Sequence, residues 1–167
     1  MRAQRPGCLA TLGMTDPFEI VPASWADLDA VHRLEVDSFP APWRREFFES
    51  ELSGDSRLHF IARRKGRLVG YVFAMWFFDE MHVNKIAVAS SDRRSGIANA
   101  LMQRCLDFAR ANGISTISLE VRQSNRGAQE FYRQLGFTTN HVRPRYYPDG
   151  EAAVVMVKEI RTMSDER

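Results

Sequence analysis

The chain has 167 residues, of which 44% are hydrophobic and 26% are charged, and its formal net charge is +2. This length suits one domain rather than two, and the composition is that of an ordinary soluble globular protein, not a disordered or fibrous one. The small net charge gives no strong signal of nucleic-acid binding.

The cysteines and the apolar runs limit which cell compartment and which kinds of site the sequence suggests. Cys8 and Cys105 are far apart and show neither zinc-ligand nor redox-pair spacing, so we expect a cytoplasmic protein without a metal site. No apolar run approaches the ~18 residues of a membrane span, so we expect no membrane partner. We expect a monomer or a weak dimer.

The two ends differ in character from the middle. Residues 1–15 contain two arginines and no acid, and their short apolar part lacks a clean cleavage site. We predict a disordered extension over residues 1–16, one domain over residues 17–160 and a frayed tail over residues 161–167. An alternative is that Met14 is the real start of the protein.

The first predicted elements are a strand and a helix. Residues 18–22 are β-prone. Ser24 followed by Asp27 fits a capping box and predicts the start of an amphipathic helix over residues 25–39, which Pro40 ends.

A second short helix is expected directly after this one, over residues 44–52. Three of its side chains are predicted to face inward: Phe47, Phe48 and Leu52. Trp43 lies in the Pro-Trp loop that joins the two helices. Together they are expected to form a flap over one side of a sheet.

The middle of the chain predicts three consecutive strands. Residues 58–64 and 68–78 are strand-like and are joined by a tight glycine-containing turn, which indicates a hairpin. A second turn at residues 79–80 leads into a central strand over residues 81–88.

The stretch that follows has the pattern of an anion site. A polar loop over residues 90–96 leads into a helix over residues 95–111, which has apolar side chains at helical spacing. The first N–H groups of a helix have no internal partner, and the helix dipole favours negative charge there. Arg93 and Arg94 add full positive charge beside Gly96, so the loop is predicted to bind a phosphate group.

The last third predicts a strand, a helix and two more strands. The strand covers residues 116–121, and the polar loop 123–125 can cap a helix that closes at Gly136. The final strands are expected over residues 137–142 and 152–158, joined by the loop 143–150. The order β-α-α-β-β-β-α-β-α-β-β predicts an α/β fold whose sheet has mixed strand directions and helices on both faces, with the strands at 81–88 and 116–121 adjacent and parallel.

Two motifs in this order resemble a known family. RRSGIA at residues 93–98 fits Arg/Gln-x-x-Gly-x-Gly/Ala, and LEVR at residues 119–122 is followed by Asn125 and a helix carrying FY and LGF. This combination resembles the GNAT acetyltransferases, and is most similar to the RimI group, which acetylates the N-terminal alanine of a ribosomal protein. Lys85 and Ala41 depart from residues common in that group. The resemblance implies a GNAT-like fold: a mostly antiparallel sheet with a splayed central parallel pair.

The resemblance also implies roles for individual residues. Glu120 matches the general base and Tyr132 the general acid. Acetyl-CoA is the implied cofactor, with coenzyme A as product, and its contacts are Ile86, Ala87, Val88, Arg93, Arg94, Ser95, Gly96, Ile97, Ala98, Asn99, Asn125 and Tyr132. The implied partner is a protein N-terminus, with that of a ribosomal protein as one candidate, contacted by Trp43, Arg145, Tyr146 and Tyr147.

The chemistry of these residues is consistent with direct acetyl transfer in a ternary complex. The amine must lose a proton, and partial burial at the end of an apolar strand is expected to raise the pKa of Glu120 towards a useful value. A backbone N–H near Val88 is expected to stabilise the thioester oxygen, provided that the parallel strands splay. Tyr132 is expected to protonate the thiolate, and Cys105, on an apolar helix face, is not placed as a nucleophile.

Several alternatives remain open from sequence. Trp43 fits core packing as well as substrate contact, and His82 fits a packing role better than a catalytic one. The loop 143–150 interleaves basic and aromatic residues, which fits a peptide-binding hairpin better than an RNA surface. The acceptor could instead be a small amine or a lysine side chain. A small polyamine would favour an acidic pocket, for which the candidates are Glu35, Asp37, Asp79 and Glu80. A third hypothesis is a non-catalytic acyl-CoA-binding or RNA-associated adaptor.

Overall fold

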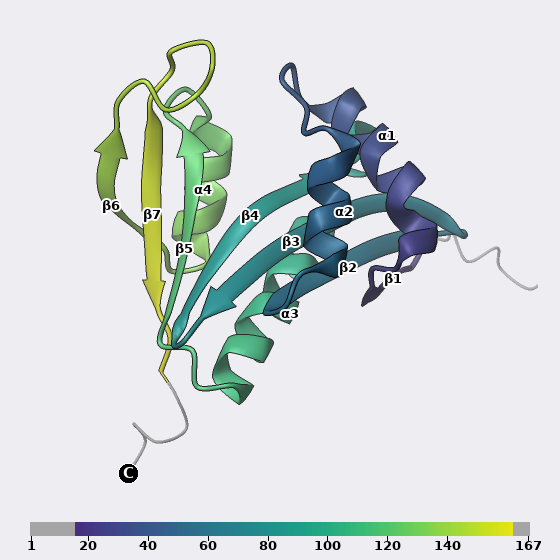
Figure 1. Cartoon of the computed structure of the whole chain (residues 1–167), viewed down its shortest axis with the longest axis horizontal. Coiled ribbons are helices and arrows are strands. Elements are labelled where there is room, and N and C mark those ends of the chain that lie inside the picture. The colour runs from purple at the N-terminus through teal and green to yellow at the C-terminus, as the bar shows by residue number, and fades with distance from the viewer. Residues whose placement is uncertain (1–15, 162–167) are drawn as a thin grey trace, which may run out of the picture.

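A computed structural model describes residues 16–161, and within this range the elements follow one another in the predicted order (Figure 1). The predictions for residues 1–15 and 162–167 fall outside the described residues. The strands are β1 (Phe18–Pro22), β2 (Arg57–Arg64), β3 (Arg67–Phe77), β4 (Glu80–Val88), β5 (Thr116–Arg122), β6 (Thr138–Arg143) and β7 (Ala153–Glu159). The α-helices are α1 (Leu28–Ser38), α2 (Arg45–Ser53), α3 (Ile97–Ala111) and α4 (Arg126–Gln134), and short 3-10 turns precede α1 and α3.

The strands form one sheet in the order β1-β2-β3-β4-β5-β7-β6. All neighbours are antiparallel except β4 and β5, which are parallel. Parallel neighbours need a crossover, and α3 supplies it. The predicted mixed sheet with one central parallel pair is therefore confirmed.

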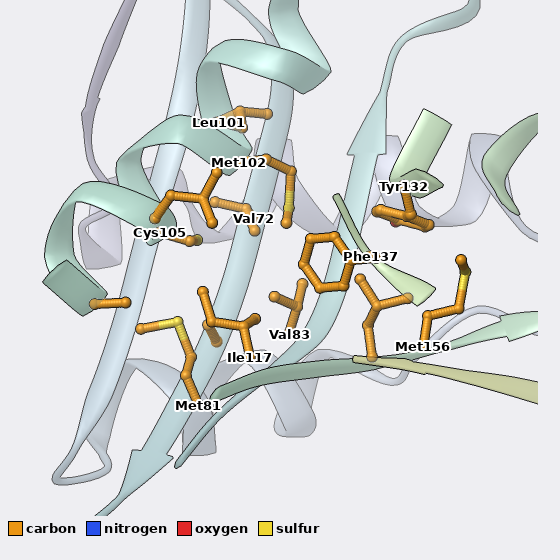
Figure 2. Close-up of a cluster of buried hydrophobic side chains, with 14 of the residues drawn as sticks. Val72, Met81, Val83, Leu101, Met102, Cys105, Ile117, Tyr132, Phe137 and Met156 are labelled. Carbon is orange, nitrogen blue, oxygen red and sulfur yellow. The ribbon is translucent and has the colours of Figure 1, made fainter. Parts of the chain in front are cut away.

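The larger apolar core lies between the sheet and the helices α3 and α4 (Figure 2). Apolar residues recur along α3 at helical spacing, so one face of the helix is buried against β2, β3 and β4. This core contains, among others, Val72, Met81, Val83, Leu101, Met102, Cys105, Ile117, Phe137 and Met156. Burial raises the pKa of the Cys105 thiol to about 12, so this thiol stays protonated and out of reach.

A second core lies on the opposite face of the sheet, under α1 and α2. Its fully or nearly buried members include Leu28, Val31, Leu34, Phe48, Tyr71 and Phe73. Phe47 was predicted to face inward as well, but its side chain is 57% exposed. The prediction was wrong because α2 buries only a narrow stripe, and adjacent positions on a helix point about 100° apart. The helices therefore cover both faces of the sheet, as predicted.

Local sequence explains where the elements begin and end. Asp27 accepts a hydrogen bond from the backbone N–H of Ser24 at 2.9 Å, which is one half of the expected capping interaction. The helix α3 begins at Ile97 and not at residue 95, because Gly96 has a φ of +83° and cannot be part of a right-handed helix.

Within residues 16–161, no helix is both long and apolar enough to cross a membrane.

Candidate active site

The strands β4 and β5 separate part-way along their length. They pair only through residues 80–83 of β4 and residues 116–119 of β5, although both strands continue beyond these residues. The register between β3 and β4 shifts at the same place, because Ala74 pairs with Val83 and Phe73 pairs with Lys85. Asn84 is therefore an extra, bulged residue, and bulges bend a strand. The result is a V-shaped opening between β4 and β5 (Figure 1).

The backbone of β4 presents hydrogen-bond donors to this opening. The N–H of Ala89 donates to the carbonyl of Val69 at 2.8 Å, which fixes the phase of the antiparallel ladder. Because alternate residues point to alternate sides of a strand, the N–H groups of Ile86 and Val88 are directed away from β3 and towards the gap. This is the arrangement that the expected thioester-stabilising role of Val88 requires.

A pocket of about 590 Å³ lies beside the N-terminus of α3. Seven predicted cofactor residues line it: Val88, Arg93, Arg94, Gly96, Ile97, Ala98 and Asn99. Two arginines, a helix N-terminus and a glycine without a side chain suit an anionic group such as a pyrophosphate. Phe131 and Gln134 of α4, and Leu135 directly after it, also line the pocket. They were not predicted, because nothing in their local sequence indicates that the end of α4 lies near the start of α3.

A buried carboxylate, that of Asp92, ties the loop before α3 to the β2–β3 hairpin. Asp92 is 4% exposed and lies 2.7 Å from Arg64 and 3.2 Å from Arg67, both in the β2–β3 hairpin. The hydroxyl of Ser95 donates to the backbone carbonyl of Asp92. Ser95 therefore serves loop geometry and does not line the pocket, and neither do Ile86 and Ala87.

Glu120 lies on β5, one residue beyond the last residue that pairs with β4. Its neighbours Leu119 and Val121 are buried on the other face of the sheet. One carboxylate oxygen is 2.7 Å from Nε2 of His82, and the other is 3.3 Å from a guanidinium nitrogen of Arg143. The carboxylate is therefore held at the splay from two sides.

The expectation that the pKa of Glu120 is raised was wrong. Burial does push this pKa upward, but the hydrogen bonds and charges of His82 and Arg143 outweigh burial and hold the pKa below its ordinary value. The carboxylate is consequently ionised at neutral pH. Arg143 was absent from the predicted site because it lies 23 residues away and reaches Glu120 only through the pairing of β5, β7 and β6.

His82 has two polar partners rather than simple core packing. Its Nδ1 lies 3.0 Å from the hydroxyl of Ser118, and its Nε2 contacts Glu120. The contact between His82 on β4 and Glu120 on β5 could not be predicted from the sequence, because it depends on the register in which the two parallel strands pair.

Tyr132 lies on the opposite face from Glu120, in the core between the sheet and α4 (Figure 2). Its side chain is 7% exposed, and its ring lies 5.8 Å from that of Phe137. Burial, and then the nearby Tyr147, raise the pKa of its phenol, so the phenol stays protonated. The predicted base and acid are thus on opposite sides of β5 and are not in direct contact.

Asn125, predicted as a cofactor contact, is the N-cap of α4. Its side-chain oxygen accepts a hydrogen bond from the N–H of Ala128 at 3.1 Å, and it does not line the pocket beside α3. The geometry therefore assigns it to orienting the helix that carries Tyr132.

The predicted substrate residues lie at the open end of the V. Arg145, Tyr146 and Tyr147 are in the β6–β7 loop, and Trp43 is in the α1–α2 loop across the opening (Figure 1). The ring of Tyr147 stacks under Arg122 at 4.1 Å, and the exposed Tyr146 stacks under Arg143 at 4.9 Å. The two loops lie on opposite sides of the V (Figure 1).

Comparison with known proteins identifies this arrangement. Residues 28–137 match the model of the acetyltransferase (GNAT) family. A ribosomal protein bS18-alanine N-acetyltransferase of Escherichia coli is 33% identical over 137 residues, which cover 80% of this chain and 92% of that protein. The catalytic subunit ard1 of the N-terminal acetyltransferase A complex of Schizosaccharomyces pombe is 31% identical, covering 87% of this chain and 88% of that one.

A solved structure shows the same fold. The crystal structure of the ribosomal-protein-S18-alanine N-acetyltransferase from Escherichia coli matches with a TM-score of 0.83 and 30% identity, over 90% of this chain and 99% of that one. The relatives are thus similar over nearly their whole length.

Proposed function

This chain belongs to the acetyltransferase (GNAT) family, whose enzymes transfer acetyl groups from acetyl-CoA, and from that premise we propose that it acetylates the N-terminal amine of a protein. An N-terminal alanine is the favoured acceptor, because relatives with about one third identical residues carry that activity in their names. The transfer occurs by direct attack within a ternary complex.

The observation that carries this proposal is the carboxylate at the splay. Glu120 lies where β4 and β5 part, and a helix N-terminus with two arginines lines a pocket together with Val88 of β4. The α1–α2 and β6–β7 loops are the two that we predict to contact the substrate. A base at this junction can reach an amine that arrives from the open end. No protein nucleophile is needed, which agrees with the burial of Cys105.

The acceptor amine must lose a proton before or during its attack on the thioester. An α-amine has a pKa near 8, so a substantial minority of it is already neutral at pH 7.5. The base therefore needs to remove a proton from only part of the bound amine, and it need not be strong. Glu120 is ionised but weakly basic, and His82 is hydrogen-bonded to it. We assign proton removal to this pair, directly or through one water.

We assign the remaining residues to binding and orienting acetyl-CoA. Arg93, Arg94 and the N–H groups at the start of α3 would hold the pyrophosphate of acetyl-CoA, and the N–H of Val88, which is directed into the gap between β4 and β5, would stabilise negative charge on the acyl oxygen. Acetyl-CoA, when bound, supplies the acetyl group as a thioester. We assign protonation of the departing sulfur to the phenol of Tyr132, whose raised pKa keeps it protonated, although it also makes the phenol a weaker acid.

A small polyamine is the second candidate acceptor, and the geometry does not favour it. Asp79 and Glu80 lie at the closed end of the V, where Glu80 pairs with Thr116, far along the strands from Glu120. Glu35 is fully buried and already paired. Of the four acids suggested from sequence, Asp37, Asp79 and Glu80 are exposed, and Asp79 and Glu80 are the two at the closed end.

The test is a comparison of three acceptors at equal concentration. The first is a peptide with a free N-terminal alanine, the second is the same peptide with a blocked N-terminus and one internal lysine, and the third is a small polyamine. We expect acetylation, read by mass, of the free N-terminus alone. Higher kcat/KM for the lysine or the polyamine would overturn the proposal.

A further inference from the structure

A second charged cluster lies on the same face of the sheet as Glu120. Glu35 of α1 is 0% exposed, and the ammonium of Lys85 on β4 lies 2.9 Å from its Oε1. The same oxygen accepts a hydrogen bond from the backbone N–H of Trp43 at 2.9 Å, and the hydroxyl of Tyr71 donates to the other oxygen. One buried carboxylate therefore joins α1, β3, β4 and the α1–α2 loop.

The charge balance of this cluster depends on Lys85. Burying an ionised carboxylate is costly unless a counter-charge and hydrogen bonds compensate. Tyr71 cannot supply the counter-charge, because a phenol is neutral when protonated and negative when ionised. Burial and the neighbouring Glu35 raise the pKa of this phenol, so it stays neutral and serves as a hydrogen-bond donor. Lys85 is the cation within bonding distance of Glu35.

Lys85 also contacts the loop itself. Its ammonium lies 3.9 Å from the ring centroid of Phe39 and 5.3 Å from that of Trp43, within the range of cation–π attraction. The loop contains Pro40 and Pro42, which have no N–H to donate. Glu35 and Lys85 thus give this loop a hydrogen bond and cation–π contacts, in addition to the packing of Phe39 and Trp43 against the core under α1 and α2.

The position of Lys85 on β4 makes this anchoring relevant to the reaction. Lys85 directly follows the bulged Asn84 and precedes Ile86, so it stands where β4 leaves β5. The same short stretch directs backbone N–H groups into the opening and holds the α1–α2 loop over it. The β6–β7 loop lies across the opening (Figure 1).

We propose that Lys85 and Glu35 form a positioning pair that fixes the α1–α2 loop as one wall of the acceptor site and presents Trp43 to the incoming peptide. The neutralised pair makes this wall aromatic and uncharged, which suits an N-terminus with a small uncharged first side chain. This inference rests on the proposed function, because the acceptor is taken to be a peptide.

The experiment compares four variants with the wild type. Lys85→Met removes the cation at similar length, and Lys85→Arg keeps it. The double variant Lys85→Met with Glu35→Gln removes both charges, so it avoids a bare buried carboxylate if the single variant fails to fold. Lys65→Met is the matched control, because Lys65 forms an exposed pair with Asp16 away from the site. Amide hydrogen exchange of residues 39–44, peptide KM, kcat and acetyl-CoA Kd are measured.

We expect faster exchange of the Trp43 amide and an increase in peptide KM of about tenfold in Lys85→Met and in the double variant, which equals about 1.4 kcal/mol. The acetyl-CoA Kd should stay within about twofold, and Lys85→Arg and Lys65→Met should resemble the wild type. Unchanged exchange and unchanged peptide KM in the double variant would overturn the proposal, and so would a loss confined to kcat or to acetyl-CoA binding.

The exchange measurement separates this proposal from the function on which it rests. It needs no acceptor and no turnover. If wild-type protein acetylates no peptide, the proposed function fails, whereas the exchange data still decide whether Lys85 and Glu35 hold the loop.

Discussion

Individual residues decide the acid–base properties of this site. Glu120 and Tyr132 could be named from sequence, because their spacing within the LEVR…FY stretch resembles a family pattern. His82 and Arg143 could not, because they meet Glu120 only through strand pairing, and sequence does not fix register. Their absence from the prediction explains the wrong direction expected for the pKa of Glu120, since only burial was considered.

The contact between Arg143 and Glu120 leads to a prediction about pH. Replacing Arg143 by Met removes a hydrogen bond and a positive charge that lower the pKa of Glu120, while burial, which raises it, remains. The midpoint of Glu120 should therefore move to higher pH. Titration of its side-chain carbon by NMR in both proteins measures this, with Arg110→Met as a control distant from the site. An unchanged midpoint would show that Arg143 does not act on Glu120 in solution.

At the scale of elements, strands and helices were predictable and their ends were less so. The apolar spacing of α3 and the turn at residues 65–67 are strong local signals, and both elements formed as expected. The packing of α4 beside the N-terminus of α3 is a tertiary event, so Phe131, Gln134 and Leu135 were missed as pocket residues. The bulge at Asn84, which begins the splay, has no sequence signal that we recognised.

The start of α3 allows a test with two glycines. Gly96 has a φ of +83° and open space where the methyl group of an alanine would stand, so Gly96→Ala should cost about 1 kcal/mol through backbone strain alone. Because this strain reorients the first N–H groups of α3, acetyl-CoA binding should weaken as well. Thermal unfolding and calorimetry measure the two effects.

Gly127 provides the matched comparison. It lies inside α4 with equally open space around it, so Gly127→Ala should stabilise the protein by about 0.5–1 kcal/mol and leave acetyl-CoA binding unchanged. Equal effects of the two substitutions on acetyl-CoA binding would argue against a special role of the α3 N-terminus.

At the scale of the whole molecule, one sheet is divided by its only parallel junction among the described residues. β1 to β4 carry α1, α2 and α3, whereas β5, β6 and β7 carry α4, and β4 and β5 diverge as a V between the two parts (Figure 1). We propose that the loop predicted to bind phosphate, Glu120 and the two loops predicted to bind substrate act together at this divergence. The sequence predicted that β4 and β5 are adjacent and parallel, because α3 joins them. The choice of acceptor depends on how two loops from different parts of the chain face each other, and no local pattern contains that information.

The central claim is that Glu120 and Tyr132 act from the two faces of β5 on one transfer. The most direct test is the rate at which an N-terminal alanine peptide is acetylated, read by mass, by wild type and by the double variant Glu120→Gln with Tyr132→Phe. General acid and base groups each contribute about 10²- to 10⁴-fold, so we predict that the double variant loses at least about 10³-fold in kcat while it stays folded and still binds acetyl-CoA. A double variant that turns over at the wild-type rate would contradict the assignment of Glu120 and Tyr132 as the acid–base residues.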